Sequence, residues 1–278
     1  MPLLGANRTK YVADSGSSCF TRFMSDRDST LVFVAMATFD GTMSEATREL
    51  WDRLDEPLGA WRFIKVKVHG VPVGRARNNL TKLAVDSYAS KLLMLDSDIN
   101  AGTVQLERLL GHKEKVVGGI YPRKEVNWPP RFVFNASGPA LPTGLQPCRE
   151  IGAGFLKIDL EVIEKIIADN PSLTYLSDAV QDDFEPCYDI WNESVIVDEW
   201  FPGKPAFARK LSEDYAFCRL ARLAGFEVWA DTICQVGHIG QVDFLQVAAQ
   251  IQACMRSTVI AAAARPSVPE STARRPKV

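Results

Sequence analysis

The sequence lacks the features that mark several large classes of protein. Its six cysteines, among 278 residues, are scattered and form no C-x-x-C pair, which argues against a structural zinc site. No apolar run approaches the length of a membrane span, so we expect no integral membrane contact. The N-terminal residues lack the hydrophobic segment of a secretory signal, and a reducing, cytoplasmic setting is the simplest expectation. The net charge of -2 gives no general attraction to nucleic acid or acidic membranes.

The first half of the chain alternates between strand-like and helix-like segments. Strands are expected at 31–38, 61–68, 91–95 and 115–121, with helices beginning near Ser44, Gly74 and Thr103. The first of these runs is apolar at almost every position, which is typical of a strand buried on both faces. The alternation predicts an α/β fold whose mostly parallel sheet is flanked by helices. For the helix at Gly74, we expect an apolar face made of Leu80, Leu83, Ala84 and Tyr88.

The second half has a different character. Six prolines fall between residues 122 and 149, so this stretch is expected to be rich in loops. Residues 151–158 are interpreted as one strand interrupted by glycines, and a helix from Asp159 to Asn170 follows. Residues 178–199 carry eight acidic side chains and neither Lys nor Arg. A helix after Ser212 and a strand at 227–236 complete the expected order.

The chain is expected to hold one main domain with two appendages. We assign residues 1–28 to an N-terminal arm and residues 29–240 to the domain. Residues 241–278 are expected to form a helix, with an apolar face over 244–251, and then a disordered tail.

The motif Asp96-Ser97-Asp98 directly follows the third expected strand. Ligands of α/β sheets bind beyond the carboxyl ends of the strands. Because residues two apart in an extended chain point the same way, both carboxylates are expected to aim at one point. Such oxygen ligands suit Mg²⁺ or Mn²⁺, which can also bind a diphosphate. The alternative is that the motif only makes a turn and caps the next helix.

His238 is the second candidate ligand. Gly237 and Gly240 flank it, which indicates a tight turn that exposes the imidazole after a strand. A neutral imidazole can complete a metal site built from carboxylates. A structural, hydrogen-bonded histidine is the alternative.

Glu213-Asp214 opens the helix after Ser212. Acidic residues in a first turn stabilise a helix through its dipole, and this is a complete structural explanation. The functional interpretation makes one carboxylate a general base that removes a proton from a hydroxyl. The dipole weakens a carboxylate as a base, so this interpretation needs burial or a neighbouring carboxylate to offset the dipole.

Two further segments are candidates for binding an anionic ligand. Arg77 and Asn78 lie in the first turns of the helix at Gly74, where guanidinium groups and helix N-termini both attract phosphate. A solvated basic turn is the alternative. Gly152-Ala153-Gly154 interrupts an otherwise good strand, which is typical of a bulge or of a close backbone approach to a ligand.

These motifs, in this order along the chain, resemble the GT-A glycosyltransferases, and more narrowly the family-2-like enzymes common in phage and viral genomes. The resemblance covers Leu31 to Gly240. It implies a GT-A, Rossmann-like α/β fold with a loop-rich second half on the acceptor side. It departs from the family where the first strand ends Ala37-Thr38-Phe39, without the proline often found there.

The resemblance also implies roles for individual residues. Thr38 would lie against the nucleotide base, and the donor would be contacted by Arg77, Asn78, Asp96, Ser97, Gly152, Ala153 and Gly154. Asp96, Asp98 and His238 would hold Mn²⁺ or Mg²⁺. Asp214 matches the catalytic base of inverting members, with Glu213 beside it. Whether the sugar's configuration is inverted or retained stays open.

The predicted function is therefore a metal-dependent glycosyltransferase that uses a nucleotide sugar, with a UDP-sugar as the preferred candidate. The acceptor hydroxyl would belong to a glycan or to a hydroxymethylated base of phage DNA, in the host cytoplasm if the protein is phage-encoded. One alternative is a non-catalytic protein of the same fold that binds a nucleotide or a partner. Another is a sugar nucleotidyltransferase, although residues 39–42 do not supply the glycine-rich basic loop that such enzymes need.

Overall fold

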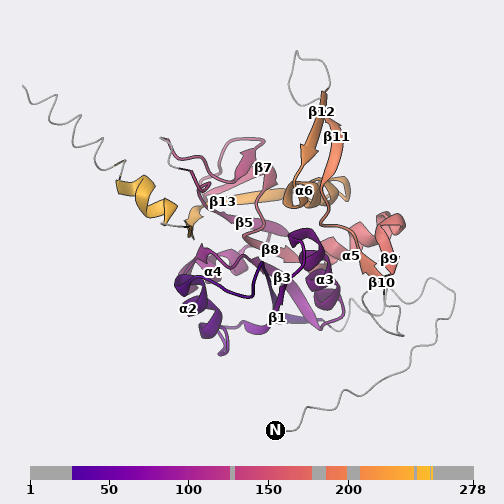
Figure 1. Cartoon of the computed structure of the whole chain (residues 1–278), viewed down its shortest axis with the longest axis horizontal. Helices are drawn as coiled ribbons and strands as arrows, with labels where there is room; N and C mark the ends of the chain where they lie inside the picture. The colour runs from indigo at the N-terminus through magenta and orange to yellow at the C-terminus, as the bar shows by residue number, and fades with distance from the viewer. Residues whose placement is uncertain are drawn as a thin grey trace, which may run out of the picture.

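The computed structural model describes residues 27–125, 129–176, 186–198, 207–240, 243–250 and 252. Its centre is an eight-stranded sheet with the order β2-β1-β3-β8-β5-β13-β7-β6 (Figure 1). The strands of this sheet are β1 (Asp28–Thr38), β2 (Arg62–His69), β3 (Ala89–Leu95), β5 (Val116–Ile120), β6 (Phe134–Ala136), β7 (Leu145–Ile151), β8 (Phe155–Asp159) and β13 (Val228–Gln235).

Most strands of the sheet run in one direction. β2, β1 and β3 are mutually parallel, and β5 and β13 are parallel to each other. β8 lies antiparallel between β3 and β5, so these two groups point the same way. β7 is antiparallel to β13 and to β6. The carboxyl ends of β2, β1, β3, β5 and β13 therefore meet at one edge of the sheet.

In the described part of the chain, the remaining short strands form three separate two-stranded sheets. β4 (Ile99–Asn100) pairs with β14 (Gly237–His238), β9 (Thr174–Leu176) with β10 (Pro186–Tyr188), and β11 (Ser194–Asp198) with β12 (Phe207–Leu211). The β11–β12 hairpin stands out from the main body beside α6 (Glu213–Leu223) (Figure 1). Only Ser212 lies between the end of β12 and the start of α6, so the hairpin leads directly into the helix.

Helices cover both faces of the sheet. Neighbouring residues of one strand point to opposite faces, and they pack in two different apolar clusters. Phe33 belongs to the cluster that contains side chains of α3 (Val73–Val85), α5 (Leu160–Asp169) and α6. Its neighbour Val34 belongs to the cluster that contains side chains of α2 (Glu45–Arg53) and α4 (Thr103–Gly111). A 3-10 turn, η1 (Pro171–Leu173), follows α5. The predicted α/β class, with a mostly parallel sheet flanked by helices, is confirmed.

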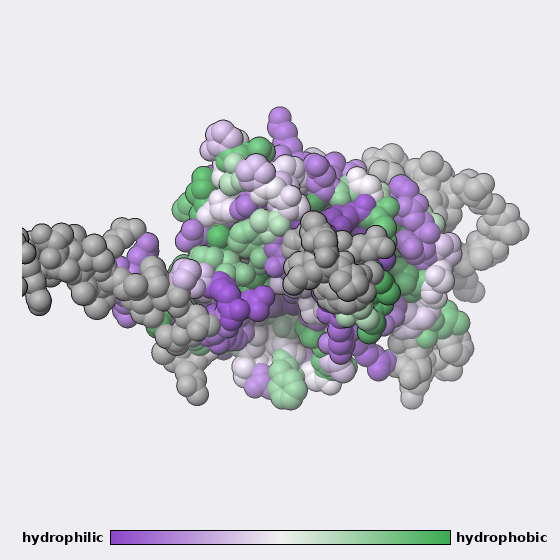
Figure 2. All heavy atoms as spheres, turned by 90° about the horizontal axis from the view of Figure 1, so that it is seen from above, coloured by the Kyte–Doolittle hydropathy of each residue, from purple (hydrophilic) through white to green (hydrophobic). Residues whose placement is uncertain are grey.

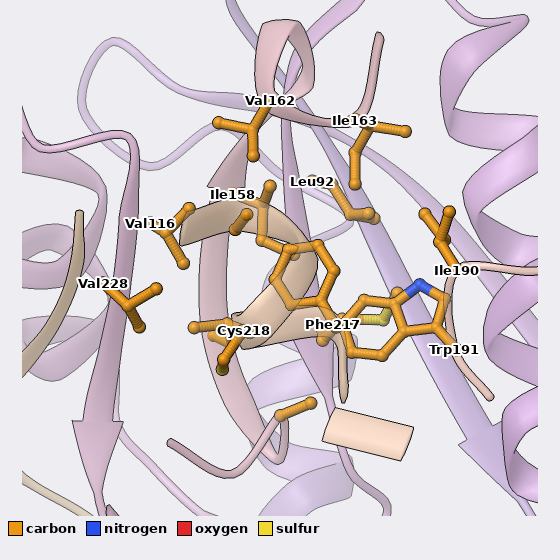
Figure 3. Packing of buried hydrophobic residues seen from close by; sticks show 14 of the residues in the cluster. Leu92, Val116, Ile158, Val162, Ile163, Ile190, Trp191, Phe217, Cys218 and Val228 are labelled. Carbon is orange, nitrogen blue, oxygen red and sulfur yellow. The ribbon is translucent and has the colours of Figure 1, made fainter. Parts of the chain in front are cut away.

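The core around α6 is well packed. Trp191 stacks on Phe217 with ring centroids 4.3 Å apart and planes 15° apart (Figure 3). Both side chains are buried, as are Cys218 and Cys234, which pack as small apolar residues. On the surface viewed from above, hydrophobic and hydrophilic side chains are interspersed (Figure 2). The described part of the chain contains no helix with both the length and the apolar character that a membrane span requires.

Two expectations about local structure are wrong. Residues 151–158 are not one interrupted strand: β7 ends at Ile151, β8 begins at Phe155, and the two strands occupy different places in the sheet. The glycines between them form the connection. On α3, Leu83 is 44% exposed and Tyr88 lies beyond the helix, 73% exposed. The other two expected residues, Leu80 and Ala84, are buried as predicted. They share the buried face with Ala76, Arg77, Asn78 and Thr81, so polar side chains take part in it.

Several expectations fall wholly or partly outside the described residues. These are the arm over 1–26, residues 178–185 and 199 of the acidic segment, and the tail from 253 onward. Residues 244–250 are helical, as expected. Of residues 122–149, the expected loop-rich stretch, β6 and most of β7 are nevertheless strands.

Candidate active site

The predicted site residues lie at the edge where the parallel strands end. Thr38 closes β1, Asp96 follows β3, and Tyr121 follows β5. Gly152-Ala153-Gly154 reaches the same edge because β8 runs antiparallel and pairs Phe155 with Leu95. The chain thus brings to one place motifs that are far apart in sequence.

Asp98 and His238 lie side by side. The short ladder of β4 and β14 pairs His238 with Ile99, and the amide of Ile239 donates to the carbonyl of Asp98 at 2.7 Å. The imidazole Nε2 is 3.7 Å from Oδ1 of Asp98. Nδ1 is 2.9 Å from the carbonyl oxygen of Pro122. Since a carbonyl only accepts, Nδ1 carries a proton, and Nε2 is the ring nitrogen that faces Asp98.

These two side chains fit a divalent cation. A histidine that ligates a metal usually donates its other N–H to a carbonyl or carboxylate, as His238 does. No group of three or more Asp, Glu, His or Cys side chains arranged for a metal occurs among the described residues. Mg²⁺ is often held by one or two protein ligands together with substrate phosphates, so a pair suffices for an ion that arrives with a diphosphate. Lys124 Nζ, 2.5 Å from Oδ2 of Asp98, currently neutralises this carboxylate.

Arg77 forms ion pairs with two of the other predicted acidic residues, Asp96 and Glu213. It is 4% exposed, and its Nη2 donates to Asp96 at 2.9 Å while its Nη1 donates to Glu213 at 2.6 Å. Burial alone would lower the pKa of Arg77, but the carboxylates of Asp96, Glu213 and Asp214 outweigh burial and raise it. The guanidinium is therefore permanently charged. It connects α3, which carries Arg77, to the start of α6 and to the end of β3.

The expectation that both carboxylates of the Asp96-Ser97-Asp98 motif aim at one point is not met. Ser97 and Asp98 lie in a turn, not in an extended strand. Asp96 consequently faces Arg77, whereas Asp98 faces Lys124 and His238. The carbonyl of Ser97 accepts from the amide of Ser44 at 2.8 Å, which fastens this turn to the start of α2. Metal and donor contacts for Asp96 and Ser97 stay predictions.

Asp214 has the environment that a general base requires. Burial raises its pKa above the ordinary value of 3.8, and the charge of Glu213 acts in the same direction. The hydroxyl of Ser212 and the positive charge of Arg77 act against this shift without cancelling it. The amide of Tyr215 donates to Oδ1 at 2.8 Å and fixes the carboxylate. The offset to the helix dipole that the sequence could not show is thus present.

Gly152-Ala153-Gly154 packs against a residue that the sequence analysis did not single out. The hydroxyl of Tyr121 accepts from the amide of Gly154 at 2.9 Å, and a Cβ on Gly152 would overlap the same hydroxyl. The carbonyl of Gly154 accepts from the amide of Asp96 at 2.8 Å. The close approach expected at these glycines is therefore to Tyr121, and a sugar pocket along Gly152, Ala153 and Gly154 stays a prediction.

Tyr121 is central to the site. It is buried, and its ring meets that of His238 edge to face with centroids 5.0 Å apart. Its pKa is raised well above 10.0, first by burial and then by the charges of Asp96 and Asp214. The phenol therefore remains protonated. Its position at the end of the strand expected at 115–121 was the only signal in the sequence.

Thr38 lines a cavity of about 530 Å³ at the ends of β1 and β2. The wall is mostly apolar, with Ala37, Val71, Pro72 and Val73 beside it. The Thr38 hydroxyl accepts from the amide of Gly41 at 2.9 Å, so the side chain is oriented by the turn that follows β1. The position is compatible with the predicted contact to a nucleotide base, which the structure leaves untested.

Asn78 has a different surrounding from the one predicted. Its Oδ1 accepts from the amides of Ile190 and Trp191 at 3.1 and 2.9 Å, and its Nδ2 donates to Asp189 at 3.0 Å. The side chain is 3% exposed. Its observed role is thus to fix residues 189–191 to α3, and a donor contact stays a prediction. In the sequence, the segment 178–199 that contains these residues is distinguished only by its acidic side chains.

No protein-family model and no curated protein matches this sequence. Among solved structures, the chain is similar to A197 from STIV, with a TM-score of 0.44, 12% identity, and coverage of 76% of this chain and 85% of that chain. It is also similar to glucosyl-3-phosphoglycerate synthase from Mycobacterium tuberculosis in complex with Mn²⁺, UDP-glucose and phosphoglyceric acid. That TM-score is 0.31 with 13% identity, over 56% of this chain and 65% of the synthase chain. At such TM-scores the likenesses carry no argument about function.

Proposed function

We propose that this protein is a metal-dependent glycosyltransferase that moves a sugar from a nucleotide-sugar donor, with a UDP-sugar as the preferred candidate, to an acceptor hydroxyl. One observation carries the proposal. A pair of metal-ligand type, Asp98 and His238, and a buried carboxylate with a raised pKa, Asp214, belong to one cluster at the carboxyl edge of the sheet. Tyr121 links them, since it contacts the ring of His238 and interacts electrostatically with Asp214.

Asp98 and His238 would hold Mn²⁺ or Mg²⁺, with Asp96 as a further ligand or as a contact to the ribose. When bound, the ion neutralises the charge that develops on the departing nucleoside diphosphate. The cavity beside Thr38 would take the base. Arg77 has its guanidinium engaged by two carboxylates, so its part is to hold Asp96 and Glu213 in place rather than to bind phosphate directly.

Asp214 would remove the proton from the acceptor hydroxyl. A carboxylate with a raised pKa is a stronger base than an ordinary one, and efficient general bases have pKa values close to the working pH. Glu213 is less suitable, because its Oε1 is in an ion pair with Arg77 at 2.6 Å. With Asp214 as the base, the acceptor oxygen attacks the anomeric carbon directly and the configuration is inverted.

A glycan hydroxyl is favoured over a hydroxymethylated DNA base as the acceptor. Two basic side chains of the segment after β5 are already paired: Arg131 with Glu125 at 2.7 Å, and Lys124 with Asp98. A DNA-binding surface needs cations that are available to several phosphates. The two acceptors are distinguished by mass spectrometry of reaction mixtures that contain neutral glycans or hydroxymethylated DNA.

The test is turnover of a panel of nucleotide sugars with and without Mn²⁺. Release of nucleoside diphosphate identifies a transferase, whereas production of pyrophosphate from a sugar phosphate and a nucleoside triphosphate identifies a nucleotidyltransferase. Asp98→Asn should abolish the metal-dependent turnover. Asp52→Asn, at an exposed position of α2, is the matched control and should leave turnover unchanged. Turnover that is indifferent both to metal and to Asp98→Asn, or no turnover of any donor, would contradict the proposal.

A further inference from the structure

A second and larger cavity adjoins the candidate active site. Its volume is about 720 Å³, and its walls come from the start of α3, from β9, from residues 189–193 and from the first residue of α6. Pro72 and Val73 belong to the walls of both this cavity and the cavity beside Thr38. The two spaces are therefore neighbours, as the sites for two substrates of one transfer have to be.

This cavity reaches the reacting end of α6. Glu213 forms part of its wall, and the proposed base Asp214 is the next residue. Asn78 and Trp191 are also in the wall, and the hydrogen bond from the amide of Trp191 to Oδ1 of Asn78 holds this side of the cavity to α3. A ligand in the cavity would thus lie against Glu213, one residue before the proposed base.

The charged groups of the wall are mostly acidic. Asp189, Glu193 and Glu213 face a single guanidinium, Arg75, among the described residues that line the cavity. The carboxylates are partly bonded already. Asp189 accepts from the side-chain amides of Asn78 at 3.0 Å and Asn192 at 2.8 Å. Glu193 forms an ion pair with Lys210 and Glu213 forms one with Arg77, but neither of these cations belongs to the cavity wall. An ionised carboxylate has about four acceptor positions, so each can still accept from a hydroxyl or an ammonium group.

An anionic ligand would meet repulsion in this cavity. Charges of like sign in a partly desolvated wall discriminate strongly against the wrong partner. Hydroxyl groups, by contrast, can donate to the carboxylates and accept from the Asn192 amide, and the ring of Tyr175 adds an amphipathic surface. The wall chemistry therefore matches a polyhydroxyl ligand.

Resting on the proposed transferase function, we propose that this cavity binds the acceptor, and that the acceptor is a carbohydrate without negative charge. Glucuronides, sugar phosphates and nucleic acid are excluded by the same charges that favour neutral and amino sugars. Glu193 is the residue through which this specificity can be changed, because it lines the cavity and is more exposed than Asp189 or Glu213.

The experiment compares matched acceptors with the donor found in the turnover panel. The probes are the octyl glycosides of glucose, glucosamine, glucuronic acid and glucose 6-phosphate, together with a panel of neutral oligosaccharides. We expect kcat/KM for the best neutral or amino acceptor to exceed that for each anionic counterpart by at least about tenfold, a difference of about 1.4 kcal/mol. Equal or better use of the anionic acceptors would overturn the inference, as would donor turnover without transfer to any of the probes.

A charge reversal tests the cavity directly. Glu193→Lys should narrow or invert the preference between glucose and glucose 6-phosphate acceptors. Lys210→Gln breaks the same ion pair from outside the cavity wall but leaves the Glu193 carboxylate in place, so it should keep or strengthen the preference for the uncharged acceptor. An unaltered preference in Glu193→Lys would overturn the inference. Total metal-dependent turnover of the donor, by transfer or by hydrolysis, separates the two proposals: its absence contradicts the transferase function, whereas normal donor turnover with the wrong acceptor preference contradicts only the acceptor site.

Discussion

The Nε2 atom of His238 faces Oδ1 of Asp98 across 3.7 Å, while the opposite nitrogen of the same ring is tied to the carbonyl of Pro122. A two-residue ladder fixes this relationship, since His238 is paired with Ile99, the neighbour of Asp98. The imidazole is thus oriented before any ion arrives. Such preorganisation is what a metal site with few protein ligands requires.

The first prediction concerns Mn²⁺ affinity. His238→Ala should weaken Mn²⁺ binding in the presence of UDP on the order of 10- to 100-fold or more, since changes even in the supporting shell of a metal site have effects of this size. Binding can be measured by the electron paramagnetic resonance signal of free Mn²⁺. His69→Asn, at the exposed end of β2, is the control and should bind the ion normally. Equal affinities in both variants would exclude His238 from the metal site.

The second prediction concerns the pH dependence of turnover. The ionised form of Asp214 is the proposed base, so activity should fall as the pH drops through its pKa. Because burial raises that pKa, the fall should occur at a higher pH than the ordinary value of 3.8 implies. Asp214→Asn should lower kcat roughly 100- to 10,000-fold and remove this limb of the pH profile. A variant that keeps wild-type kcat would show that Asp214 is not the base.

The same shift has a consequence for stability. A carboxyl whose pKa is raised in the folded state stabilises the fold at pH values below its unfolded pKa, and this contribution is lost as the pH rises through the folded pKa. The wild type is therefore penalised at neutral pH, and Asp214→Asn, which can still accept from Ser212 and Tyr215, should have a higher Tm at pH 7. The gain should shrink below about pH 4, where Asp214 is protonated in both states. An equal gain at both pH values would point to packing instead of charge.

The main elements of the fold were predictable because burial on both faces leaves a strong signal. The segment Leu31–Thr38 is apolar along almost its whole length, and it forms the larger, C-terminal part of β1. The strand ends were visible for the same reason, because polar Asp96 interrupts an apolar run. Since parallel strands end at one edge, the rough location of the site followed from these ends alone.

The insertion of β8 between β3 and β5 was not predictable from local pattern. Its residues Phe155–Ile158, which are apolar except for Lys157, follow β7 after only Gly152-Ala153-Gly154, so the segment resembles one strand. Only the pairing of Phe155 with Leu95 and of Val116 with Ile158 shows that the chain changes its place in the sheet. Such pairing depends on residues distant in sequence.

The directions in which the side chains of the site point could not be predicted from the local sequence pattern either. The side chains of Asp96 and Asp98 point in different directions: Asp96 forms an ion pair with Arg77, and Asp98 forms one with Lys124. Tyr121 and Trp191 have no distinctive sequence context, yet one supports the Gly152–Gly154 connection and the other anchors the wall of the larger cavity. Their roles arise from tertiary contacts, which a single sequence does not display.

The third prediction concerns Arg77. Its planar guanidinium reaches Asp96 and Glu213 at once, whereas a lysine is a point charge that cannot match both in this geometry. Arg77→Lys should therefore destabilise the fold by about 1–3 kcal/mol, and Arg77→Met, which leaves the carboxylates unneutralised, by about 3–5 kcal/mol. Urea unfolding measures both. Arg48→Lys, on the exposed side of α2, should change stability by less than about 0.5 kcal/mol, and an equally small effect of Arg77→Met would contradict the bridging role.

The last prediction separates the contribution of Tyr121 from that of the glycine beside it. Tyr121→Phe removes the hydroxyl that accepts from the buried amide of Gly154, which should cost about 1–3 kcal/mol of stability. Gly152→Ala places a methyl group against the same hydroxyl and should cost about 1–3 kcal/mol through overpacking. Gly111→Ala is the control, because a Cβ there meets nothing within 4 Å, and it should be neutral or mildly stabilising.

The double variant decides whether the hydroxyl itself is the obstacle at Gly152. If it is, Tyr121→Phe makes room for the new methyl group, and the two losses should not add: the combined loss should fall short of their sum by at least about 0.5 kcal/mol. The relief should be partial, because the ring carbon Cζ of Tyr121 would still lie 3.0 Å from the new Cβ. Strict additivity in urea unfolding would show that Gly152 is required by Val133, whose Cγ1 would lie 2.8 Å from the same Cβ, and not by Tyr121.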